Sequence, residues 1–291
     1  MDSHIIVIGS TGRIGRAYTY HLQKNNLKFV GISKTDTQNE YNHIKIDFNV
    51  PGMKKVEEFV SNNKIQAIIH LATTNTLMDD SLEYHEKINV GSVKLFLEVI
   101  EKYKLGCPFI YTSTELVFNS KKEGHNENSP DFSPLGNYAK SKLVAEKEAL
   151  KYKNSIVIRF GNVIGIENDF LSSALNILKQ KKDYNAWGNV YNRFTYIDDI
   201  IYALDEAISY KGNQKIFHVA CNDPPLSRYE FLKRVIELKY KNSDFLKYLN
   251  KTSATRKQLS IRPQYAVLNT KITEKELNFK PRSIFYYLSK Q

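Results

Sequence analysis

The stretch Gly9-Ser10-Thr11-Gly12-Arg13-Ile14-Gly15 follows the apolar, β-branched run His4–Ile8 and leads into a helical pattern over Ile14–Asn25. Glycines at these spacings allow a sharp turn after the strand, close approach of a pyrophosphate to the backbone, and close packing of the helix on the strand. The amino terminus of the helix offers N–H groups and the positive end of its dipole to an anion. Because it lies at the first strand-to-helix junction, the stretch predicts a dinucleotide-binding fold.

Apolar runs and helical patterns alternate through the first half of the chain. Expected strands are Phe29–Ile32, Ile44–Ile46, Ala67–Leu71, Phe109–Thr112 and Ile156–Phe160, and expected helices are Lys54–Asn62, Glu83–Tyr103 and one from Tyr138 through Leu150. The strand runs are continuously apolar, which indicates burial on both faces. We therefore expect an α/β fold with a doubly wound parallel (Rossmann) sheet, which binds ligands outside the carboxyl ends of its strands.

The chain changes character near Pro224, where it becomes polar and rich in Lys and Tyr, and Ser227–Tyr240 is its clearest helix. No internal repeat or low-complexity linker separates the two halves. We expect a dinucleotide-binding domain over 1–160, to which 190–220 returns, and a smaller, mostly helical C-terminal substrate-binding lobe over 161–189 and 221–291.

Composition indicates an ordinary globular protein. Of the 291 residues, 42% are hydrophobic and 25% are charged, which is enough apolar surface to build a core. No run approaches the ~18 apolar residues of a membrane helix, and the first residues lack the basic region and cleavage site of a secretion signal. Cys107 and Cys221 lie far apart without metal-ligand or redox spacing. We expect reduced thiols, a cytoplasmic protein and no metal site.

The net charge of +11 raises the question of a nucleic-acid or membrane partner. The lysines are scattered, however, and no zinc-finger, helix-turn-helix or RNP-like pattern accompanies them. The charge therefore predicts a lysine-rich solvated surface, with neither nucleic acid nor membrane as a partner. A basic field also suits a substrate that carries phosphates.

The end of the second expected strand bears on the choice of nicotinamide cofactor. NAD-binding versions of this fold usually place an acidic residue there to hold the ribose 2′-hydroxyl. Here the segment reads Gly31-Ile32-Ser33-Lys34-Thr35, with a hydroxyl and a base, and Arg13 lies in the glycine loop. This cationic setting favours the 2′-phosphate of NADP(H) over NAD(H). Asp36 lies close by and weakens the preference.

Tyr138 and Lys142 lie four residues apart, on the same side of an expected helix. A phenol with a pKa of ~10 is a poor acid or base at neutral pH, but a nearby ammonium stabilises the phenolate. This pair is common by chance and is not diagnostic alone. Thr114, just past the strand that begins at Phe109, adds a hydroxyl suited to a substrate carbonyl. Together with the glycine loop, these residues favour a nicotinamide-dependent oxidoreductase with Tyr138 as its general acid/base.

With these residues in place, the chain resembles the extended short-chain dehydrogenases/reductases, the NAD-dependent epimerase/dehydratase family that modifies nucleotide sugars. Its landmarks occur in order, namely the glycine loop, Asp47-Phe48, His70-Leu71-Ala72, Asn89-Val90, Tyr111–Thr114, Tyr138-x-x-x-Lys142, Arg159–Gly165 and Tyr196–Asp199. The resemblance implies that Thr114 is the catalytic hydroxyl, that Asp47 and Phe48 border the adenine, and that Asn162 lies near the substrate diphosphate. It also implies a homodimer.

The candidate residues fall into three sets. The catalytic set is Thr114, Tyr138, Lys142 and Glu115. The cofactor set is Gly9, Thr11, Gly12, Arg13, Ile14, Gly15, Ser33, Lys34, Asp47, Phe48, Leu71, Ala72, Thr73, Asn89, Tyr138 and Lys142. The substrate set is Thr74, Thr114, Asn162, Arg193 and Arg262.

Several candidates have a competing structural interpretation. Arg193 and Arg262 suit a diphosphate by charge, but the interpretation as surface arginines is favoured for each. Glu115 suits a sugar hydroxyl or proton transfer, and equally a capping role. His70 is expected to pack under the cofactor, and Trp187 to lie in the core or at the edge of the substrate cleft.

The residues that follow the catalytic hydroxyl differ between the enzymes of this family that catalyse different reactions. The sugar 4,6-dehydratases have a Thr-Asp-Glu motif at this place, whereas this chain has Thr114-Glu115-Leu116. Because Leu116 cannot transfer a proton, dehydration is disfavoured. The 4-epimerases carry small residues after the hydroxyl and an acidic residue after the second strand. Glu115 and the Ser33-Lys34 segment of this chain fit that pattern poorly. The chain looks most like the dTDP-4-dehydrorhamnose reductase branch in four stretches, namely Ser113–Asn119, Ser133–Tyr138, Arg262-Pro263 and Val267–Thr270. That branch usually has Gln at the position of Arg13 and a different loop over 73–76, so the sugar and base stay open.

The sequence thus predicts reduction of a 4-keto (deoxy)sugar nucleotide by hydride from NADPH, in which Thr114 holds the carbonyl oxygen and Tyr138 protonates it. Two alternatives remain. One is an NAD(P)-dependent nucleotide-sugar epimerase, and the other is a non-catalytic regulatory subunit that binds NADP(H).

Overall fold

The computed structural model describes residues 3–37, 41–50, 52–74, 81–240 and 244–290. The chain divides into two compact units, described separately below. Unit 1 comprises Met1–Thr114, Asn137–Arg159 and Ile201–Phe217, and unit 2 comprises Glu115–Gly136, Phe160–Ile200 and His218–Gln291. This division differs from the expected one in two places. The segment returning to unit 1 is shorter than 190–220, and 115–136 groups with unit 2 because His125 forms a bridge with Leu268.

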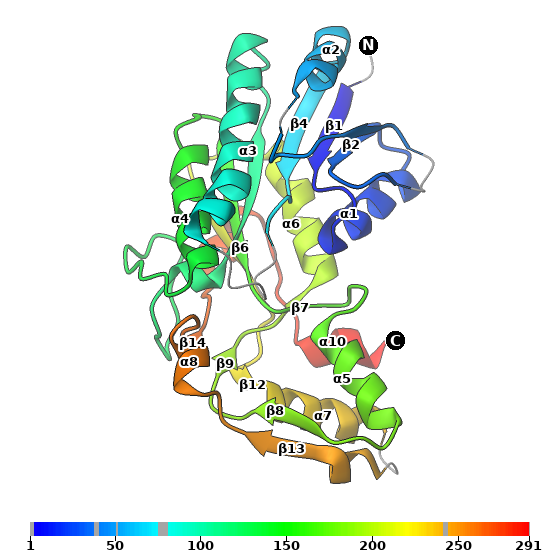
Figure 1. Ribbon diagram of the computed structural model, residues 1–291, viewed down its shortest axis with the longest axis vertical. Coiled ribbons are helices and arrows are strands. Elements are labelled where there is room, and N and C mark those ends of the chain that lie inside the picture. Colours follow the sequence, from blue (N-terminus) through cyan, green and yellow to red (C-terminus); the bar gives the residue numbers. More distant parts are fainter. Residues whose placement is uncertain (1–2, 38–40, 51, 75–80, 241–243, 291) are drawn as a thin grey trace. The chain divides into compact units, whose positions relative to one another are not determined.

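A seven-stranded sheet forms the centre of unit 1 (Figure 1). Its order is β11-β6-β5-β4-β1-β2-β3, where the strands are β1 (Ser3–Ile8), β2 (Phe29–Ser33), β3 (His43–Lys45), β4 (Lys64–His70), β5 (Phe109–Thr114), β6 (Ser155–Phe160) and β11 (Ile216–Val219). The pairs β1–β2, β1–β4, β2–β3 and β4–β5 all run parallel. The expected doubly wound parallel sheet is confirmed.

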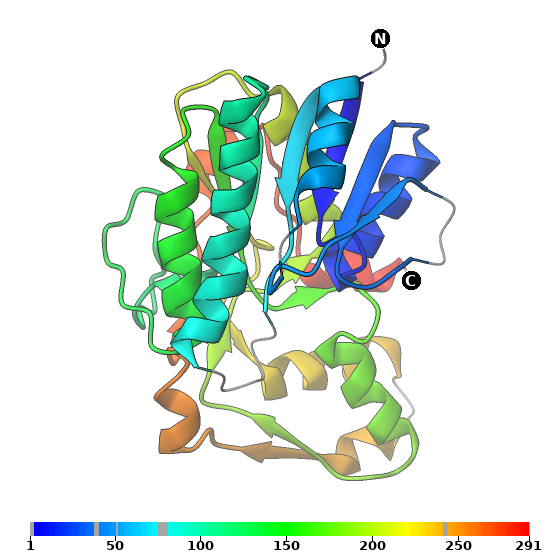
Figure 2. The ribbon, with the colours of Figure 1, turned by 45° about the horizontal axis from the view of Figure 1, so that its top comes forward.

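Helices cover both faces of this sheet, which explains the continuously apolar strands. They are α1 (Arg13–Lys24), α2 (Lys54–Asn62), α3 (Leu82–Lys102), α4 (Asn137–Ala149) and α6 (Ile197–Ser209). Ile6 and Ile8 belong to the core cluster that also contains side chains of α2, α3 and α4, whereas Ile5 and Val7 point to the opposite face and are buried as well. Figures 1 and 2 show α3 and α4 side by side on one face.

The sequence placed most boundaries within one or two residues. The largest shift is in β4, which begins at Lys64 rather than Ala67. Lys64 and Gln66 are exposed and interrupt the apolar run, yet the backbone still pairs, with Ser3 opposite Lys64. The polar side chains at the start of this strand are the reason that its first three residues were not predicted.

Unit 2 is built from short elements. Its strands form a β7–β10 pair, a β8–β13 pair and a three-stranded sheet β12-β9-β14, with bounds β7 (Val163–Ile164), β8 (Tyr184–Trp187), β9 (Tyr191–Asn192), β10 (Thr195–Tyr196), β12 (Leu226–Ser227), β13 (Leu249–Thr252) and β14 (Tyr265–Ala266). Its helical segments are η1 (Glu115–Val117), α5 (Phe170–Lys179), α7 (Arg228–Lys239), η2 (Asp244–Tyr248), α8 (Arg256–Leu259), α9 (Lys271–Glu276) and α10 (Ile284–Ser289). Within the described ranges, no helix of either unit has the length and apolar character that a membrane span requires.

Candidate nicotinamide and substrate sites

The glycine loop between β1 and α1 leaves no room for side chains. Gly9 has a φ of +84°, and a Cβ there would lie 2.6 Å from the backbone nitrogen of Ala72. A Cβ on Gly15 would lie 2.1 Å from the carbonyl oxygen of Gly9. Gly12 caps α1 without a side-chain hydrogen bond, and the first turn of the helix, where Arg13 and Ile14 lie, holds no acidic residue. This cradle fits the pyrophosphate of a dinucleotide.

Leu71 and Ala72 follow β4 and lie beside this loop. The amide of Leu71 donates to the carbonyl oxygen of Ile8 at 2.8 Å, and Ala72 packs against Gly9. The structure therefore brings together the segments that follow the first and fourth strands, as expected for the carboxyl edge of a parallel sheet.

At the end of β2, the expected ribose-binding residues Ser33 and Lys34 already have partners in neighbouring segments. The Ser33 hydroxyl donates to the carbonyl oxygen of Thr35 and lies 2.8 Å from Nε2 of His43. The Thr11 and Thr35 hydroxyls are 2.8 Å apart. Lys34 Nζ lies 3.0 Å from a carboxylate oxygen of Asp47. The Ser33 side chain thus supports the turn after β2.

The charges at this edge alternate in sign. Besides Lys34 with Asp47, Lys45 pairs with Asp36 at 2.6 Å. The backbone N–H of Asn49, followed by Lys34, lowers the pKa of Asp47. Both carboxylates therefore offset part of the cationic setting that the sequence indicates.

Phe48, expected beside the adenine, is 8% exposed and belongs to the core cluster. Its ring makes an edge contact with Phe96 of α3, with 6.3 Å between the ring centroids. Most of this side chain is therefore core.

Lys142 lies buried under α4, 2% exposed. Its Nζ donates to the carbonyl oxygen of Thr112 at 2.6 Å and lies 4.1 Å from the centroid of the Tyr111 ring. Burial lowers the pKa of this ammonium to about 7, and the charge of Glu146 opposes part of that shift. Because burial has brought its pKa close to neutrality, small changes in its surroundings change its charge at physiological pH.

A buried ion pair fixes α4 to the sheet one turn beyond Lys142. Glu146 accepts two hydrogen bonds from Arg159 of β6, at 2.9 Å from Nε and 2.6 Å from a terminal nitrogen, and both side chains are fully buried. Bidentate geometry of this kind sets the orientation of a helix as well as its distance from the strand. The family landmark that begins at Arg159 therefore supports the helix of Tyr138 and Lys142.

Asn89, expected at the cofactor, connects three segments of unit 1. Its carbonyl oxygen accepts from the Thr73 hydroxyl at 3.2 Å and from the Thr74 amide at 3.0 Å. Its amide nitrogen donates to the Thr74 hydroxyl at 3.2 Å and to the Ser141 hydroxyl at 2.8 Å. Ser141 in turn donates to the carbonyl oxygen of Tyr138. Asn89 thus joins the loop after β4 to the helix that carries Tyr138.

His85 joins this network and was not among the sequence candidates. Its Nδ1 lies 2.6 Å from the Thr74 hydroxyl, and its ring meets the Tyr138 ring edge-on, with 6.1 Å between centroids. Thr74, expected at the substrate, is therefore buried and engaged on both sides. Nothing in the spacing of His85 signals this role, because its partners come from other segments.

The hydroxyls at the end of β5 have different roles. Thr112 donates to the carbonyl oxygen of His70 at 3.0 Å and supports the sheet, whereas Thr114 is the last residue of the strand and is 6% exposed. His70 packs between Phe109 and Tyr111. Burial, followed by the charge of Lys142, lowers the pKa of His70 to about 3. The ring is therefore neutral at physiological pH.

In unit 2, Glu115 is buried and its carboxylate packs on Gly161, where a Cβ would lie 2.0 Å from the carboxyl carbon. Asn162 follows with a φ of +39°, a left-handed conformation that Asn tolerates better than most residues. Leu116 is 8% exposed, and its apolar side chain has no proton to transfer in a dehydration.

Arg193 is not a surface arginine. Its guanidinium donates to the carbonyl oxygens of Asp223 and Leu268, at 3.1 and 2.9 Å. Burial lowers its pKa. The side chain braces two segments of unit 2, and in the described part of the chain its hydrogen bonds go to neutral carbonyls rather than to a carboxylate.

Arg228 is a second arginine of unit 2 that the sequence candidates did not include. Its guanidinium lies over the rings of Phe170 and Trp187, at 5.0 and 5.5 Å from their centroids. Burial, followed by the charge of Arg262, lowers its pKa. Among the described residues, neither Arg228 nor Arg262 forms an ion pair with a carboxylate. Trp187 thus contacts the Arg228 guanidinium, whose pKa is also affected by the positive charge of Arg262.

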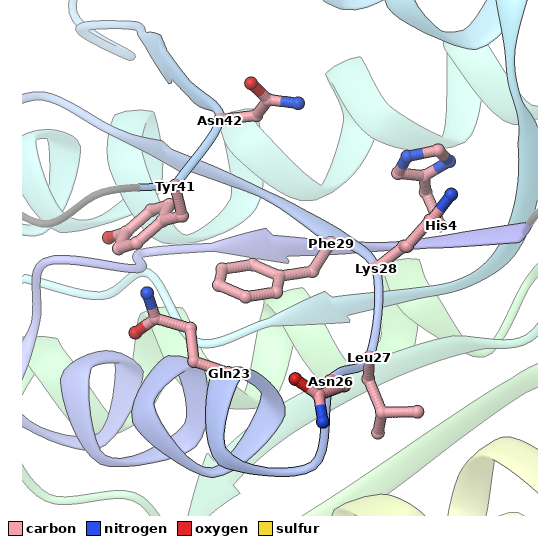
Figure 3. A pocket seen from close by; sticks show the side chains of 8 residues that line it. All are labelled: His4, Gln23, Asn26, Leu27, Lys28, Phe29, Tyr41 and Asn42. Atoms are coloured by element: carbon pink, nitrogen blue, oxygen red, sulfur yellow. The ribbon is translucent and has the colours of Figure 1, made fainter.

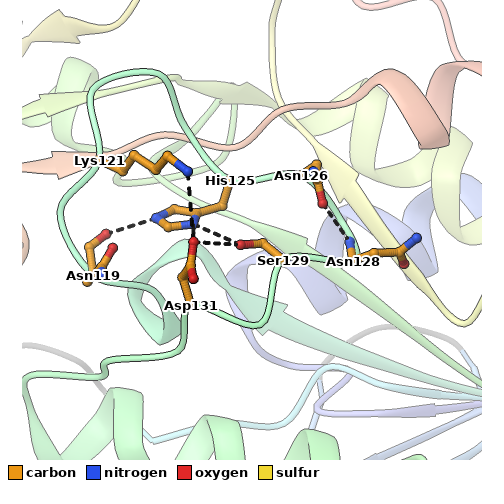
Figure 4. Close-up of polar contacts among 7 residues, drawn as sticks. All are labelled: Asn119, Lys121, His125, Asn126, Asn128, Ser129 and Asp131. Carbon is orange, nitrogen blue, oxygen red and sulfur yellow. Dashed lines mark hydrogen bonds and ion pairs between the residues drawn. The ribbon is translucent and has the colours of Figure 1, made fainter.

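The 115–136 segment holds a His, a Ser and an Asp within contact of one another (Figure 4). Nδ1 of His125 lies 3.2 Å from the Ser129 hydroxyl and 3.7 Å from Asp131, whereas Nε2 faces the carbonyl oxygen of Asn119. A Ser-His-Asp triad needs the Ser and the Asp on opposite ring nitrogens. The cluster, in which His125 also stacks on Phe118, therefore holds the loop in shape.

A hollow in unit 1 lies apart from the glycine loop (Figure 3). It is lined by His4 and Phe29 near the starts of β1 and β2, and by Asn26 and Leu27 before β2. It therefore occupies the amino edge of the sheet, opposite the glycine loop.

Comparison with known proteins gives relatives of distinct kinds. The chain is 22% identical over 286 residues to the spore coat polysaccharide biosynthesis protein SpsK of Bacillus subtilis, covering 96% of this chain and 93% of that protein. It is 24% identical over 239 residues to the methionine adenosyltransferase 2 subunit beta of Danio rerio, covering 78% and 71%. A dTDP-4-dehydrorhamnose reductase from Bacillus anthracis, solved in complex with NADP, superposes with a TM-score of 0.80 at 17% identity, covering 100% and 98%.

The last likeness shows a shared fold. The family model of the RmlD substrate binding domain matches residues 3–289, which takes in all three candidate sets. The chain therefore belongs to the RmlD substrate binding domain family.

Proposed function

We propose that this protein is a nicotinamide-dependent oxidoreductase that reduces the keto group of a 4-keto (deoxy)sugar nucleotide, with NADPH as the hydride donor. The observation that carries the proposal is the placement of α4, which seats the buried Lys142 ammonium on the Thr112 carbonyl and carries Tyr138 one turn earlier. Thr114 ends the strand on which that ammonium rests. Family membership, the glycine cradle and a basic net charge support it.

In the proposed reaction, Thr114 hydrogen-bonds the carbonyl oxygen and Tyr138 delivers a proton to it as negative charge develops. Bound NADPH supplies the hydride that reduces the carbonyl carbon. The proton leaves the phenol, and the positive charge of Lys142 stabilises the phenolate that results. The Asn89–Ser141 hydrogen bonds hold the backbone of Tyr138 during this transfer.

Cofactor binding is proposed at the glycine loop, with Arg13 and Lys34 at the 2′-phosphate. The preference for NADP(H) over NAD(H) then depends on an exchange, because Lys34 already pairs with Asp47. The 2′-phosphate must compete with that carboxylate, which predicts a moderate preference.

The substrate diphosphate is proposed to bind Arg193, Arg262 and Asn162. The partly buried Arg193, bonded only to carbonyls among the described residues, supports an anionic partner. Glu115 is assigned to a sugar hydroxyl, and Leu116 argues against the proton transfer that dehydration needs. We extend the proposal to a cytoplasmic homodimer.

The test is a loss of reduced-nicotinamide absorbance when the purified protein receives NADPH and a 4-keto-6-deoxy sugar nucleotide. Stoichiometric oxidation of NADPH is the expected result, faster than with NADH. A product with inverted stereochemistry and no net oxidation would favour the epimerase instead.

A regulatory subunit that binds NADP(H) without catalysis is the second candidate. Its support is the likeness to the methionine adenosyltransferase 2 subunit beta, whose name describes a subunit of another enzyme. This candidate predicts NADPH binding and no turnover with any keto sugar nucleotide.

A further inference from the structure

The side-chain amino group of Lys142 has few contacts that decide whether it is protonated. Among the described residues, its direct partners are two neutral groups, the carbonyl oxygen of Thr112 at 2.6 Å and the face of the Tyr111 ring at 4.1 Å. The buried carboxylate whose charge acts on Lys142, that of Glu146, already accepts two hydrogen bonds from Arg159. No carboxylate of the described residues pairs directly with Lys142.

The other groups around Lys142 favour or oppose its charge in known directions. His70 on β4 is neutral, and Arg159 on β6 is positive but paired. Glu146 and Tyr138 lie on α4 itself, and only Glu146 carries a charge that favours the ammonium. A buried ammonium with these neighbours needs further stabilisation to stay protonated.

The ring of Tyr111 lies next to that ammonium, with 4.1 Å between Nζ and the ring centroid. The negative face of an aromatic ring attracts a cation within about 6 Å, and the attraction is larger when both groups are desolvated. Tyr111 is fully buried on β5, so water does not weaken the contact. Its hydroxyl is buried and has no hydrogen-bond partner among the described residues, so the ring rather than the hydroxyl is the part in use.

We propose that the ring of Tyr111 is a positioning element that keeps the Lys142 ammonium charged and seated beside Tyr138. The catalytic consequence rests on the proposed function, whereas the contact between ring and ammonium does not. Loss of the ring leaves an ammonium held by one carbonyl, and the neutral amine becomes favoured at lower pH.

The test is a carbon-13 NMR titration of Lys142 in full-length protein labelled at the lysine ε-carbon, without substrate, with the resonance assigned by Lys142→Arg. Tyr111→Leu is expected to lower the titration midpoint by about 0.5 to 1.5 pH units. Tyr111→Phe is expected to move it by less than half of that, because the ring remains. Phe109→Leu is the matched control, since Phe109 is an equally buried ring two residues earlier on the same strand.

A shape-preserving series covers the case in which Tyr111→Leu fails to fold. Phenylalanine, monofluorophenylalanine and trifluorophenylalanine at position 111 keep the ring but remove its negative face stepwise, so the midpoint should fall stepwise. The proposal is overturned if the trifluorinated ring leaves the midpoint at the phenylalanine value, or if Phe109→Leu lowers it as much as Tyr111→Leu.

Activity separates this proposal from the proposed function. If the protein reduces keto sugars, the pH profile of kcat should move with the NMR midpoint while KM for the keto sugar changes little. A midpoint that moves in a protein without reductase activity would leave the Tyr111 contact established and the proposed function refuted. Reductase activity with an unmoved midpoint would support the proposed function and refute the role of the Tyr111 ring.

Discussion

The two ends of the proposed nicotinamide site in unit 1 are built differently. At the centre of the sheet, Lys142 and Asn89 are buried. Lys142 donates to a backbone carbonyl, and Asn89 bonds to hydroxyls and a backbone amide. At the outer edge, beyond β2 and β3, Lys34 and Lys45 are exposed, and they pair with the partly exposed Asp47 and the exposed Asp36. The central end is fixed by geometry, whereas the outer end is held by charges that water and ligands can exchange.

This difference sets the expected size of every substitution. A buried polar group that loses its partner leaves another group unsatisfied, which is unfavourable by about 1–3 kcal/mol. An exposed ion pair contributes about 0–1 kcal/mol. Changes at the centre should therefore affect catalysis and folding, and changes at the edge should mainly affect cofactor choice.

The largest effect is expected at the centre, from Tyr138→Phe. Removing the acid should lower kcat about 10²- to 10⁴-fold, with cofactor binding nearly unchanged because α4 keeps its anchors. Reduced-nicotinamide absorbance measures the rate and fluorescence titration measures binding. Tyr20→Phe, on a side chain 68% exposed, is the control and should keep full activity. Equal rates for the two variants would remove Tyr138 from the mechanism.

The glycine loop lies between the two ends and should respond strongly. In Gly15→Ala the new Cβ would lie 2.1 Å from the Gly9 carbonyl oxygen, so the loop must shift and the Kd for NADPH should rise by about a hundredfold or more. Gly52→Ala places its Cβ in open space and is the matched control. Calorimetric titration of both variants checks this expectation, and an unchanged Kd for Gly15→Ala would place the cofactor elsewhere.

A smaller effect is expected at the outer edge. Lys34→Ala should weaken NADPH binding about three- to tenfold and NADH binding much less, because only NADPH brings a 2′-phosphate. Lys45→Ala, which removes the partner of Asp36, serves as the comparison and should leave the preference unchanged. If Lys34→Ala weakens both cofactors equally, the lysine does not read the 2′-phosphate.

The last comparison takes one histidine from each end, and its effect is expected in stability rather than in catalysis or binding. Below its ordinary pKa of 6.5, His70 takes up a proton in the unfolded chain but resists it when folded, because its folded pKa is about 3. His70 therefore makes the free energy of unfolding fall as pH falls from 6.5 towards 3, by about 1.4 kcal/mol per pH unit. His70→Gln should remove this contribution to the slope.

His43, on β3, is the matched histidine of the outer edge. Burial lowers its pKa, the charge of Asp36 opposes the shift, and the ring is partly exposed. His43→Gln should therefore flatten the slope much less than His70→Gln. Urea unfolding of each variant between pH 4 and pH 7 measures the slopes, and equal flattening would contradict the contrast between centre and edge.

The sequence predicted the elements of the centre well, because strands that are buried on both faces need continuous apolar runs such as Phe109–Thr112. It also predicted the glycine loop, whose steric demands are local. For Asn89, by contrast, no local sign indicates that its amide bonds Ser141. His85 gave no signal at all. Side chains whose partners lie in other segments become identifiable only once the fold brings those segments together.

The outer edge was predicted by residue type but not by pairing. Lys34 and Asp47 are both candidates for the cofactor, and the ion pair between them changes what Lys34 offers a phosphate. In unit 2, the sequence alone allows Arg193 to be a surface arginine, because its two carbonyl contacts depend on residues 30 and 75 positions further along the chain. Arg228 was missed because stacking on Trp187 and Phe170 leaves no spacing pattern.

Hydride transfer, the defining step of the proposed reaction, can be followed with NADPH that carries deuterium at the transferable position of the nicotinamide. The protein is incubated with this cofactor and a 4-keto-6-deoxy sugar nucleotide, and the product is examined by mass spectrometry. We expect one deuterium atom in each product molecule and one NADP⁺ formed per product. A product without deuterium, or no product while NADPH stays bound, would contradict the assignment as a reductase.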